Sequence, residues 1–204
     1  MTDADLCMFT EFLVNFMTRD QVEFSARGVT GAMRTALKNL GDDFERIPID
    51  IYYYADYLSA QENKTATREL LFVKMRAIMG YAKIMWGNNS AQVKQFDAGK
   101  MMLQDDKKLL TTCRMAVNIA EDYLSDLSPV GLTQAMITDL DTTCQTFEDN
   151  LNAISAAVAI RDIKARERIT MGNELFSLVQ RYCRIGKIIW TDVNYAKYND
   201  YLMY

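Results

Sequence analysis

The stretch of sequence that decides the fold occurs twice. Residues 25–33 read Ser-Ala-Arg-Gly-Val-Thr-Gly-Ala-Met, and residues 128–136 read Ser-Pro-Val-Gly-Leu-Thr-Gln-Ala-Met, an offset of 103 residues. The match continues through the pairs Leu37 and Leu140, Phe44-Glu45 and Phe147-Glu148, and then, at an offset of 104, Leu71-Phe72 and Leu175-Phe176, and Lys83 to Trp86 and Lys187 to Trp190. A repeat of this length is a supersecondary unit that packs against its copy, so the chain is predicted to be a tandem duplication.

Apolar residues recur at helical spacing in almost every segment of the chain. In the first half one such stripe comprises Val29, Met33, Leu37, Leu40, Phe44, Ile47, Ile51, Tyr54 and Leu58. Each half is predicted to contain a short helix followed by two long ones. The predicted fold class is therefore all-α: an elongated antiparallel helical bundle of two tandem three-helix repeats, residues 1–99 and 100–204, that share one core. The alternative is two separate three-helix bundles joined at Gly99.

The duplicated stretch contains signals for the end of one helix and the start of the next. Gly28 and Gly131 are suited to the left-handed conformation that ends a helix, and Thr30 and Thr133 are suited to cap the following one. Pro48 falls within the first apolar stripe, and because the stripe continues in phase beyond it, we expect a kink there rather than a helix end.

Further helix boundaries are expected at sites with weaker signals. Residues 63–65 and 164–167 are predicted to turn between the second and third helices of the two halves, and residues 97–100 to separate the halves. The C-terminal tail is predicted to leave the last helix near Tyr198 and to lie against the end of the bundle. Tyr201 and Tyr204 are then at least partly buried.

The composition argues against several classes of partner. The 204 residues carry a formal net charge of −4 with no long basic cluster, so nucleic acid is not expected to bind. No apolar run reaches the roughly 20 residues of a membrane span. The first five residues lack the basic region of a signal peptide, and together with four cysteines expected to be free this favours a cytoplasmic location, with a removed leader left open.

The sequence contains no histidine, which removes the commonest general base and the imidazole ligand of most zinc and haem sites. No glycine-rich phosphate loop is present, and the apolar stripes singled out in the sequence, such as that from Val29 to Leu58, contain no acidic residues. We therefore expect no enzyme activity, no catalytic or metal-binding residues and no cofactor, although an all-carboxylate metal site remains possible in principle. The cysteines are expected to be small buried apolar side chains.

Aromatic residues supply the candidate interaction surface. Neighbouring tyrosines on one helix point about 100° apart, so they cannot all face a single core. The possible interface residues are Tyr53, Tyr57, Trp190, Tyr195 and Tyr198. The alternative is that these side chains pack between helices of the same chain.

Three elements of the sequence together carry a resemblance: Gly-Leu-Thr at 131–133 before a long amphipathic segment, Phe147-Glu148, and Gly-Lys-Ile-Ile-Trp at 186–190 followed by the aromatic segment 195–201. The chain resembles a group of duplicated all-helical bacterial proteins of unknown function, some with β-rich modules after the tail. The resemblance implies a helical bundle and supplies no catalytic residues. The aromatic segment 195–201 has no sequence counterpart after Trp86, which suggests a role in the second copy alone, or none.

From these observations we predict that the protein is a non-catalytic module for protein–protein interaction or structural scaffolding, which binds a protein partner or associates with itself. The alternative from another class is a small-molecule sensor, which needs a pocket between helices lined by a few polar groups.

Overall fold

The computed structural model describes residues 1–48, 50–96 and 101–203 and contains no strand in these ranges, so the protein is all-α. The elements are α1 (Asp3–Arg19), α2 (Gln21–Ala26), α3 (Gly31–Arg46), α4 (Asp50–Trp86), α5 (Ala91–Gln95), the 3-10 turn η1 (Met101–Leu103), α6 (Asp106–Asp122), α7 (Leu124–Leu127), the 3-10 turn η2 (Ser128–Val130), α8 (Gln134–Trp190) and α9 (Tyr195–Asp200).

The chain forms two compact units, and each takes segments from both halves of the sequence. Unit 1 comprises Met1–Tyr53 and Ile160–Tyr204, and unit 2 comprises Tyr54–Ala159. Unit 1 therefore contains α1, α2 and α3 with the C-terminal part of α8 and α9. Unit 2 contains most of α4 with α5, α6, α7 and the N-terminal part of α8.

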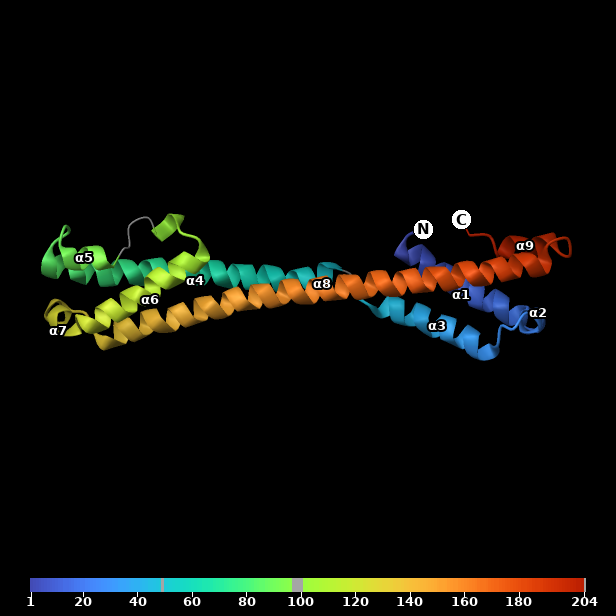
Figure 1. The fold of residues 1–204 in the computed structure, drawn as a ribbon, viewed down its shortest axis with the longest axis horizontal. Helices are drawn as coiled ribbons and strands as arrows, with labels where there is room; N and C mark the ends of the chain where they lie inside the picture. The colour runs from blue at the N-terminus through green and yellow to red at the C-terminus, as the bar shows by residue number, and fades with distance from the viewer. Residues whose placement is uncertain (49, 97–100, 204) are drawn as a thin grey trace. The chain divides into compact units, whose positions relative to one another are not determined.

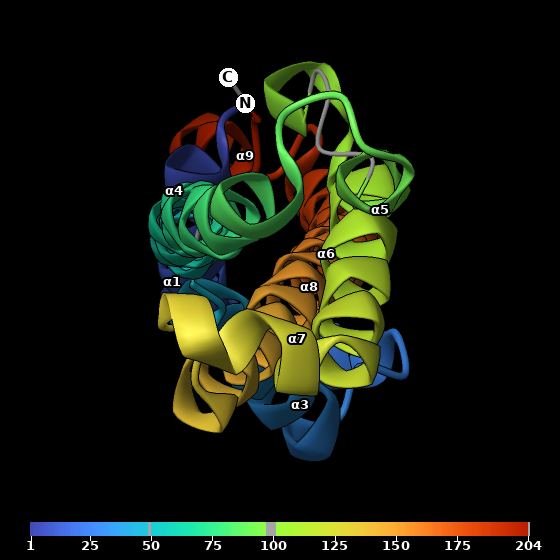
Figure 2. The ribbon, with the colours of Figure 1, turned by 90° about the vertical axis from the view of Figure 1, so that its left-hand side faces the viewer.

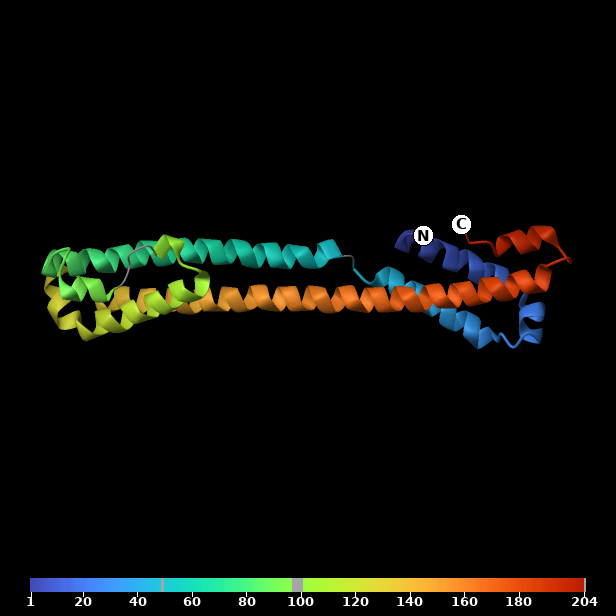
Figure 3. The same ribbon diagram turned by 45° about the horizontal axis from the view of Figure 1, so that its top comes forward.

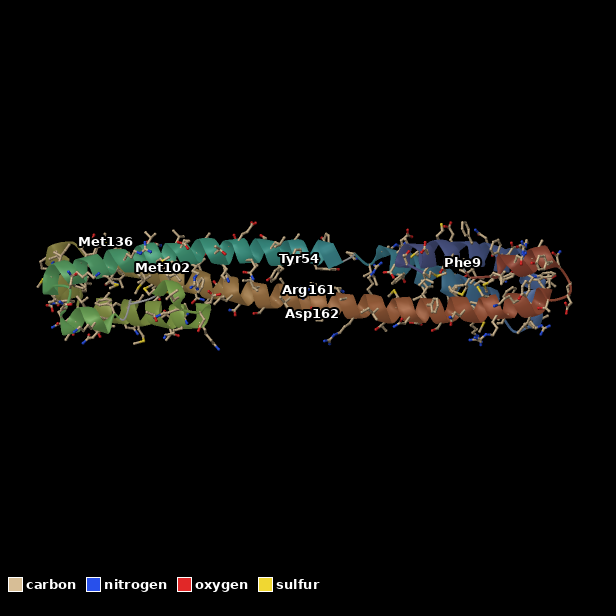
Figure 4. All side chains as sticks on the ribbon, turned by 90° about the horizontal axis from the view of Figure 1, so that it is seen from above. Phe9, Tyr54, Met102, Met136, Arg161 and Asp162 are labelled. Carbon is tan, nitrogen blue, oxygen red and sulfur yellow. The ribbon has the colours of Figure 1, made fainter. Side chains whose placement is uncertain are left out.

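In unit 1, the blue helices α1 to α3 accompany the red end of α8 and α9 (Figure 1). The core of this unit is apolar and includes Tyr201 of the C-terminal tail. Its buried members are Leu6, Leu13, Met17, Phe24, Val29, Leu37, Phe44, Leu175, Val179, Tyr182, Cys183, Trp190 and Tyr201. Phe9 on α1 packs against this core from a partly buried position (Figure 4).

In unit 2, α4, α6 and the start of α8 run alongside one another, and the views of Figures 2 and 3 agree on this. Its core is centred on residues of these three helices: Leu71, Phe72, Met75, Ile78, Ala82, Leu109, Leu110, Cys113, Ala116, Val117, Ala120, Ile137, Leu140, Cys144 and Phe147. Val93 and Phe96 add the short segment around α5 to the same core.

The predicted helix ends at the duplicated stretch are confirmed. Gly28 has a φ of +78° and Gly131 a φ of +107°, which is the left-handed region that glycine adopts without strain. The hydroxyl of Thr30 accepts a hydrogen bond from the Met33 amide at 3.3 Å, and that of Thr133 accepts one from the Met136 amide at 3.4 Å. Each threonine satisfies an amide of the first turn that has no partner within the helix.

The expected kink at Pro48 is wrong, because the helix ends before it. Helix α3 stops at Arg46, and Ile47 is extended, with ψ of 118°. A residue before proline is pushed out of the helical region by the proline ring, and proline has no amide hydrogen to continue the helix. Here that local effect outweighs the apolar stripe.

The two turns expected between the second and third helices are also wrong. Helix α4 continues through residues 63–65, and α8 continues through residues 164–167. Neither segment contains Gly or Pro that would end the helix, and in α8 Lys164 pairs with Glu167 at 2.7 Å, three residues along the same helix face. The separator expected at residues 97–100 lies outside the described residues.

The tail departs from the helix earlier than expected. Helix α8 ends at Trp190 rather than near Tyr198, and α9 follows with the side chain of Asn194 capping its first turn. Tyr201 is fully buried, as predicted, whereas Tyr204 lies outside the described residues.

Candidate functional site

A fully buried carboxylate, Asp20, is the most unusual group in unit 1. It sits at the corner where α1 ends and α2 begins, with a φ of −100° and a ψ of 29°. In sequence it continues the apolar spacing of Leu13, Met17 and Phe24, so its position on that face of the chain points the side chain into the core. A buried charge is stable only when it is paired and hydrogen-bonded.

Donors from three parts of the chain surround the Asp20 carboxylate. Oδ1 accepts from Arg19 Nε at 2.9 Å and from Lys197 Nζ at 2.8 Å. Oδ2 accepts from Arg19 NH2 at 2.8 Å, from Trp190 Nε1 at 3.0 Å and from the Tyr201 hydroxyl at 2.8 Å. The end of α8 and the segment around α9 are thereby attached to the corner between α1 and α2.

Burial alone raises the pKa of the Asp20 carboxyl, but hydrogen bonds from Arg19, Lys197 and Tyr201 outweigh it and hold this pKa well below its usual range. Burial, and then the bond to Asp20, raise the pKa of the Tyr201 phenol well above its ordinary value. The Asp20 carboxylate is therefore ionised and the phenol neutral at neutral pH. A carboxylate whose oxygens already accept several hydrogen bonds is a poor proton acceptor. This cluster therefore acts as a structural link between the α1–α2 corner and the C-terminal segment, rather than as an acid–base pair.

Close packing of Tyr201 and Lys197 also holds the C-terminal segment in place. A Cβ built on Gly186 of α8 would lie only 2.3 Å from Cδ1 of Tyr201, so the tyrosine ring rests directly on the backbone of α8. Lys197 also lies over the Trp190 ring, with its Nζ 3.9 Å from the ring centroid. Residue 186 is thus confined to glycine while the Tyr201 ring stays where it is.

The interface residues predicted in the tail occupy contrasting environments. Trp190 is buried and bonded to Asp20, and Tyr198 is half-buried against the core of unit 1. Tyr195 is 79% exposed and stacks on Tyr198 with ring centroids 6.5 Å apart. The structure brings these three residues into one region, where Tyr195 has the largest exposed surface.

The other two predicted residues lie on α4 in different units. Tyr53 is half-buried in unit 1, with its ring edge-on to Tyr52 at 5.4 Å. Tyr57 is half-buried in unit 2, where its hydroxyl accepts a hydrogen bond from Gln61 and its ring stacks on Tyr54 at 5.7 Å. Tyr54 itself is exposed (Figure 4).

Sequence reasoning missed Asp20, Lys197 and Tyr201 as a cluster. The available signal was an acidic residue at an apolar position, since Asp20 follows Met17 by three residues and precedes Phe24 by four. The sequence alone does not identify Lys197 and Tyr201 as its partners, because they lie more than 170 residues away.

A groove of about 550 Å³ lies in unit 1 between α1 and α3. Its lining includes Cys7, Thr10, Glu11, Gly41 and Glu45. Two ion pairs stand at its edges: Asp3 with Arg168 at 2.9 Å and Lys38 with Asp42 at 2.6 Å. The lining of the groove includes more acidic than basic side chains, and within it Thr10 packs against Gly41.

All four cysteines are free; Cys7 is half-buried and the other three are buried. Burial raises the pKa of the Cys183 thiol to about 12. In the described ranges, 1–48, 50–96 and 101–203, no group of three or more Cys, Asp or Glu side chains is placed to hold a metal ion.

Comparisons with known protein families, curated proteins and solved structures give no match for this chain. Among the helices of the described ranges, none has a stretch long and apolar enough to cross a membrane.

Proposed function

We propose that the protein is a non-catalytic helical module for protein–protein interaction or structural scaffolding, built from two tandem repeats. The observation that carries this proposal is that the core of each compact unit contains residues from both halves of the sequence: α1 to α3 with the end of α8 in unit 1, and α4 with α6 and the start of α8 in unit 2. A chain organised in this way holds two packed units on continuous helices, which suits a scaffold.

Matched local structure at the offset of 103 supports the repeat. Helix α1 runs from Asp3 to Arg19, and α6 runs from Asp106 to Asp122, so both of its bounds are displaced by 103 residues. The short helices also correspond, at an offset of 104: Ser90 caps α5 through the amide of Val93, and Asn194 caps α9 through that of Lys197. Helix α5 is thus a structural counterpart of α9 that the sequence comparison did not reveal.

Matched ion pairs support a reciprocal exchange of helices between the repeats. In unit 1, Asp3 of α1 pairs with Arg168 of α8 at 2.9 Å; in unit 2, Asp106 of α6 pairs with Lys64 of α4 at 3.0 Å. Asp3 corresponds to Asp106, and Lys64 corresponds to Arg168. The first helix of each repeat therefore packs on the last long helix of the other repeat.

This exchange is tested by cross-linking. In a chain whose native cysteines are replaced by alanine, D3C/R168C and D106C/K64C place one cysteine in each repeat. A short bismaleimide should give an internally cross-linked monomer for both pairs at low protein concentration. Cross-linked dimers, or no product from either pair, would contradict the exchange within one chain.

Exposed apolar side chains at corresponding positions support an interaction role. Large apolar side chains are exposed at three matched pairs of positions: Phe12 and Met115, Met33 and Met136, and Ile84 and Ile188. Met136 is among the residues that Figure 4 labels. Apolar residues exposed at the same place in both repeats are suited to binding another protein surface.

The interaction role is tested with the most exposed matched pair. Ile84 is 71% exposed and Ile188 is 55% exposed, whereas Leu103 is 82% exposed and has no matched position. We expect I84Q/I188Q to weaken self-association in sedimentation, or capture of a partner from the source cell, while L103Q does not. Equal circular-dichroism melts exclude unfolding. The proposal would be contradicted by two results together: the unmodified chain is monomeric at every concentration, and every partner it captures is captured equally well by I84Q/I188Q.

The groove of unit 1 supports a second candidate, a small-molecule sensor. Its volume of about 550 Å³ is within the range of ligand pockets, and Thr10, Cys7 and Asn15 supply polar groups among its lining residues. A thermal-shift screen against metabolites tests this candidate. Stabilisation by one compound, following its concentration and lost in a G41L variant, would favour it over the scaffold.

A further inference from the structure

Two of the buried cysteines lie side by side in the core of unit 2. Cys113 is on α6 and Cys144 is on α8, and both are fully buried in the same apolar cluster. The two thiols interact closely enough for each to shift the pKa of the other. The next residue along α6, Arg114, is bonded to Glu148, one turn beyond Cys144, at 2.6 Å. The two helices therefore face each other at this pair.

The corresponding position in unit 1 gives an independent measure of the helix approach. Residues 103 positions earlier are Thr10 on α1 and Gly41 on α3. A Cβ built on Gly41 would lie 3.7 Å from the Cβ of Thr10. Disulfide bonds in proteins have Cβ–Cβ distances of about 3.5–4.5 Å, with a mean near 3.8 Å. The crossing of α1 and α3 in unit 1 thus has the spacing that a disulfide requires, and Cys113 and Cys144 occupy the corresponding positions on α6 and α8.

We propose that Cys113 and Cys144 form a site of reversible disulfide modification that links α6 to α8. The oxidant is a disulfide, either a small one such as oxidised glutathione or a protein dithiol oxidase. The Cys144 thiolate attacks one sulfur of the oxidant and releases the other as a thiolate, which leaves a mixed disulfide. The Cys113 thiolate then attacks the Cys144 sulfur, and the second oxidant thiolate leaves. The two protein thiols lose two protons and two electrons, and the oxidant becomes two thiols.

The surroundings favour this order of attack. Interaction with Cys113 lowers the pKa of the Cys144 thiol, whereas interaction with Cys144 and burial raise the pKa of the Cys113 thiol. The thiolate is the attacking species in disulfide exchange. Because both side chains are fully buried, the oxidant must reach them through local opening of α6 from α8, and the finished bond is shielded from reductants.

The bond would act on one unit only. It closes the chain segment that contains α7 and η2, so it removes disorder from the unfolded form of unit 2 and leaves unit 1 unchanged. The proposal rests on the proposed repeat for the spacing of the crossing, but not on the scaffold function, because both cysteines lie in unit 2.

The test uses the full chain with C7A/C183A, which leaves only the proposed pair. After incubation with oxidised glutathione, unreacted thiols are alkylated in denaturant and the protein is digested for mass spectrometry. We expect a peptide pair linked through Cys113 and Cys144 in a monomeric protein, and a rise of several degrees in the melting of unit 2 that dithiothreitol reverses. Full alkylation of both cysteines at all oxidant concentrations, or bonds only between molecules, would overturn the proposal.

Placing a cysteine pair at the corresponding crossing in unit 1 tests whether the geometry of the crossing is what allows the disulfide to form. In a chain with all four native cysteines replaced by alanine, T10C/G41C puts two cysteines at the corresponding crossing in unit 1. The same oxidant should link them within one monomer. A control, T10C/K38C, moves the second cysteine away from the crossing by almost one helical turn and should form far less internal bond. If T10C/G41C and T10C/K38C react alike, the crossing geometry is not the cause.

Discussion

The corners at which α1 meets α2 and α6 meets α7 have the same backbone but opposite chemistry. Asp20 has a φ of −100° and a ψ of 29°, and Tyr123, 103 residues later, has a φ of −103° and a ψ of 15°. In unit 1, Trp190 donates its indole N–H to Asp20 at 3.0 Å. In unit 2, the matching Trp86 instead packs edge-on against the Tyr123 ring at 5.0 Å.

The difference extends to the short helices that follow each tryptophan. Helices α5 and α9 are each followed directly by a buried aromatic residue, Phe96 and Tyr201. In α9, Lys197 and the Tyr201 hydroxyl bind the Asp20 carboxylate, whereas Val93 of α5 is a buried apolar residue. A buried charge is therefore not needed to close this corner. In unit 1, where the charge occurs, its directional hydrogen bonds determine the position and orientation of the tail. Apolar contacts specify such an orientation less strictly.

The largest expected effect is that of D20A. The change leaves Trp190 Nε1 and the Tyr201 hydroxyl buried without a partner, which should lower the free energy of unfolding of unit 1 by about 3–5 kcal/mol. Urea unfolding followed by Trp190 fluorescence in a W86F background measures it, because each unit contains one of the two tryptophans. The matched control D42A removes an exposed ion pair with Lys38 and should change stability by less than about 0.5 kcal/mol. An equal effect of both changes would refute the comparison.

Acid should weaken unit 1 through the same carboxylate. The hydrogen bonds on Asp20 hold its folded-state pKa below the unfolded value of about 3.9, so its stabilisation is fully present above that pH. It is lost progressively as pH falls below about 4, because the unfolded state then binds a proton that the folded state resists. Unfolding of W86F between pH 6 and pH 2 should show this loss and D20N should not. A parallel pH dependence in both proteins would assign the loss to other carboxyls.

Much of the architecture could be predicted from local signals, and the errors have definite physical origins. The duplicated stretch predicted the left-handed glycines and capping threonines, because those features depend only on neighbouring residues. The predicted ends of the long helices were wrong in two ways: one helix ends where a kink was expected, and two helices continue where a turn was expected. Ile47 is driven out of the helix by the following proline, whereas residues 63–65 and 164–167 contain no glycine or proline that would end a helix.

The pairing of segments was harder to predict than their helicity. Each compact unit takes segments from both halves of the sequence, and the apolar stripes alone do not say which segments pack together. The Asp20 cluster depends on that pairing, because Arg19 and Asp20 lie near the N-terminus and Trp190, Lys197 and Tyr201 lie near the C-terminus. Such a cluster can be identified only once the pairing of the segments is known.

A smaller effect is expected from G186A. The new methyl group would meet the Tyr201 ring at 2.3 Å, and the overpacking should destabilise unit 1 by about 1–3 kcal/mol despite the better helix propensity of alanine. Unit 2 has Ala82 at the matching position, where it is fully buried. The control G80A has open space at its Cβ within α4 and should stabilise unit 2 by up to about 1 kcal/mol. Urea unfolding with each unit's tryptophan measures both, and stabilisation by G186A would mean that Tyr201 does not rest on α8.

The smallest expected effect tests the similarity of the two units rather than their difference. Thr30 and Thr133 cap corresponding helices with nearly equal hydrogen bonds, 3.3 Å and 3.4 Å. Replacing either by alanine leaves one first-turn amide without its side-chain partner, so T30A and T133A should each cost about 1 kcal/mol. Trp190 emission in W86F reports the first change, and Trp86 emission in W190F reports the second. Because the capping geometry is duplicated, the two losses should agree within about 0.5 kcal/mol. Effects that differ by much more would mean that the repeats diverge at their duplicated stretch as well as at the Asp20 corner.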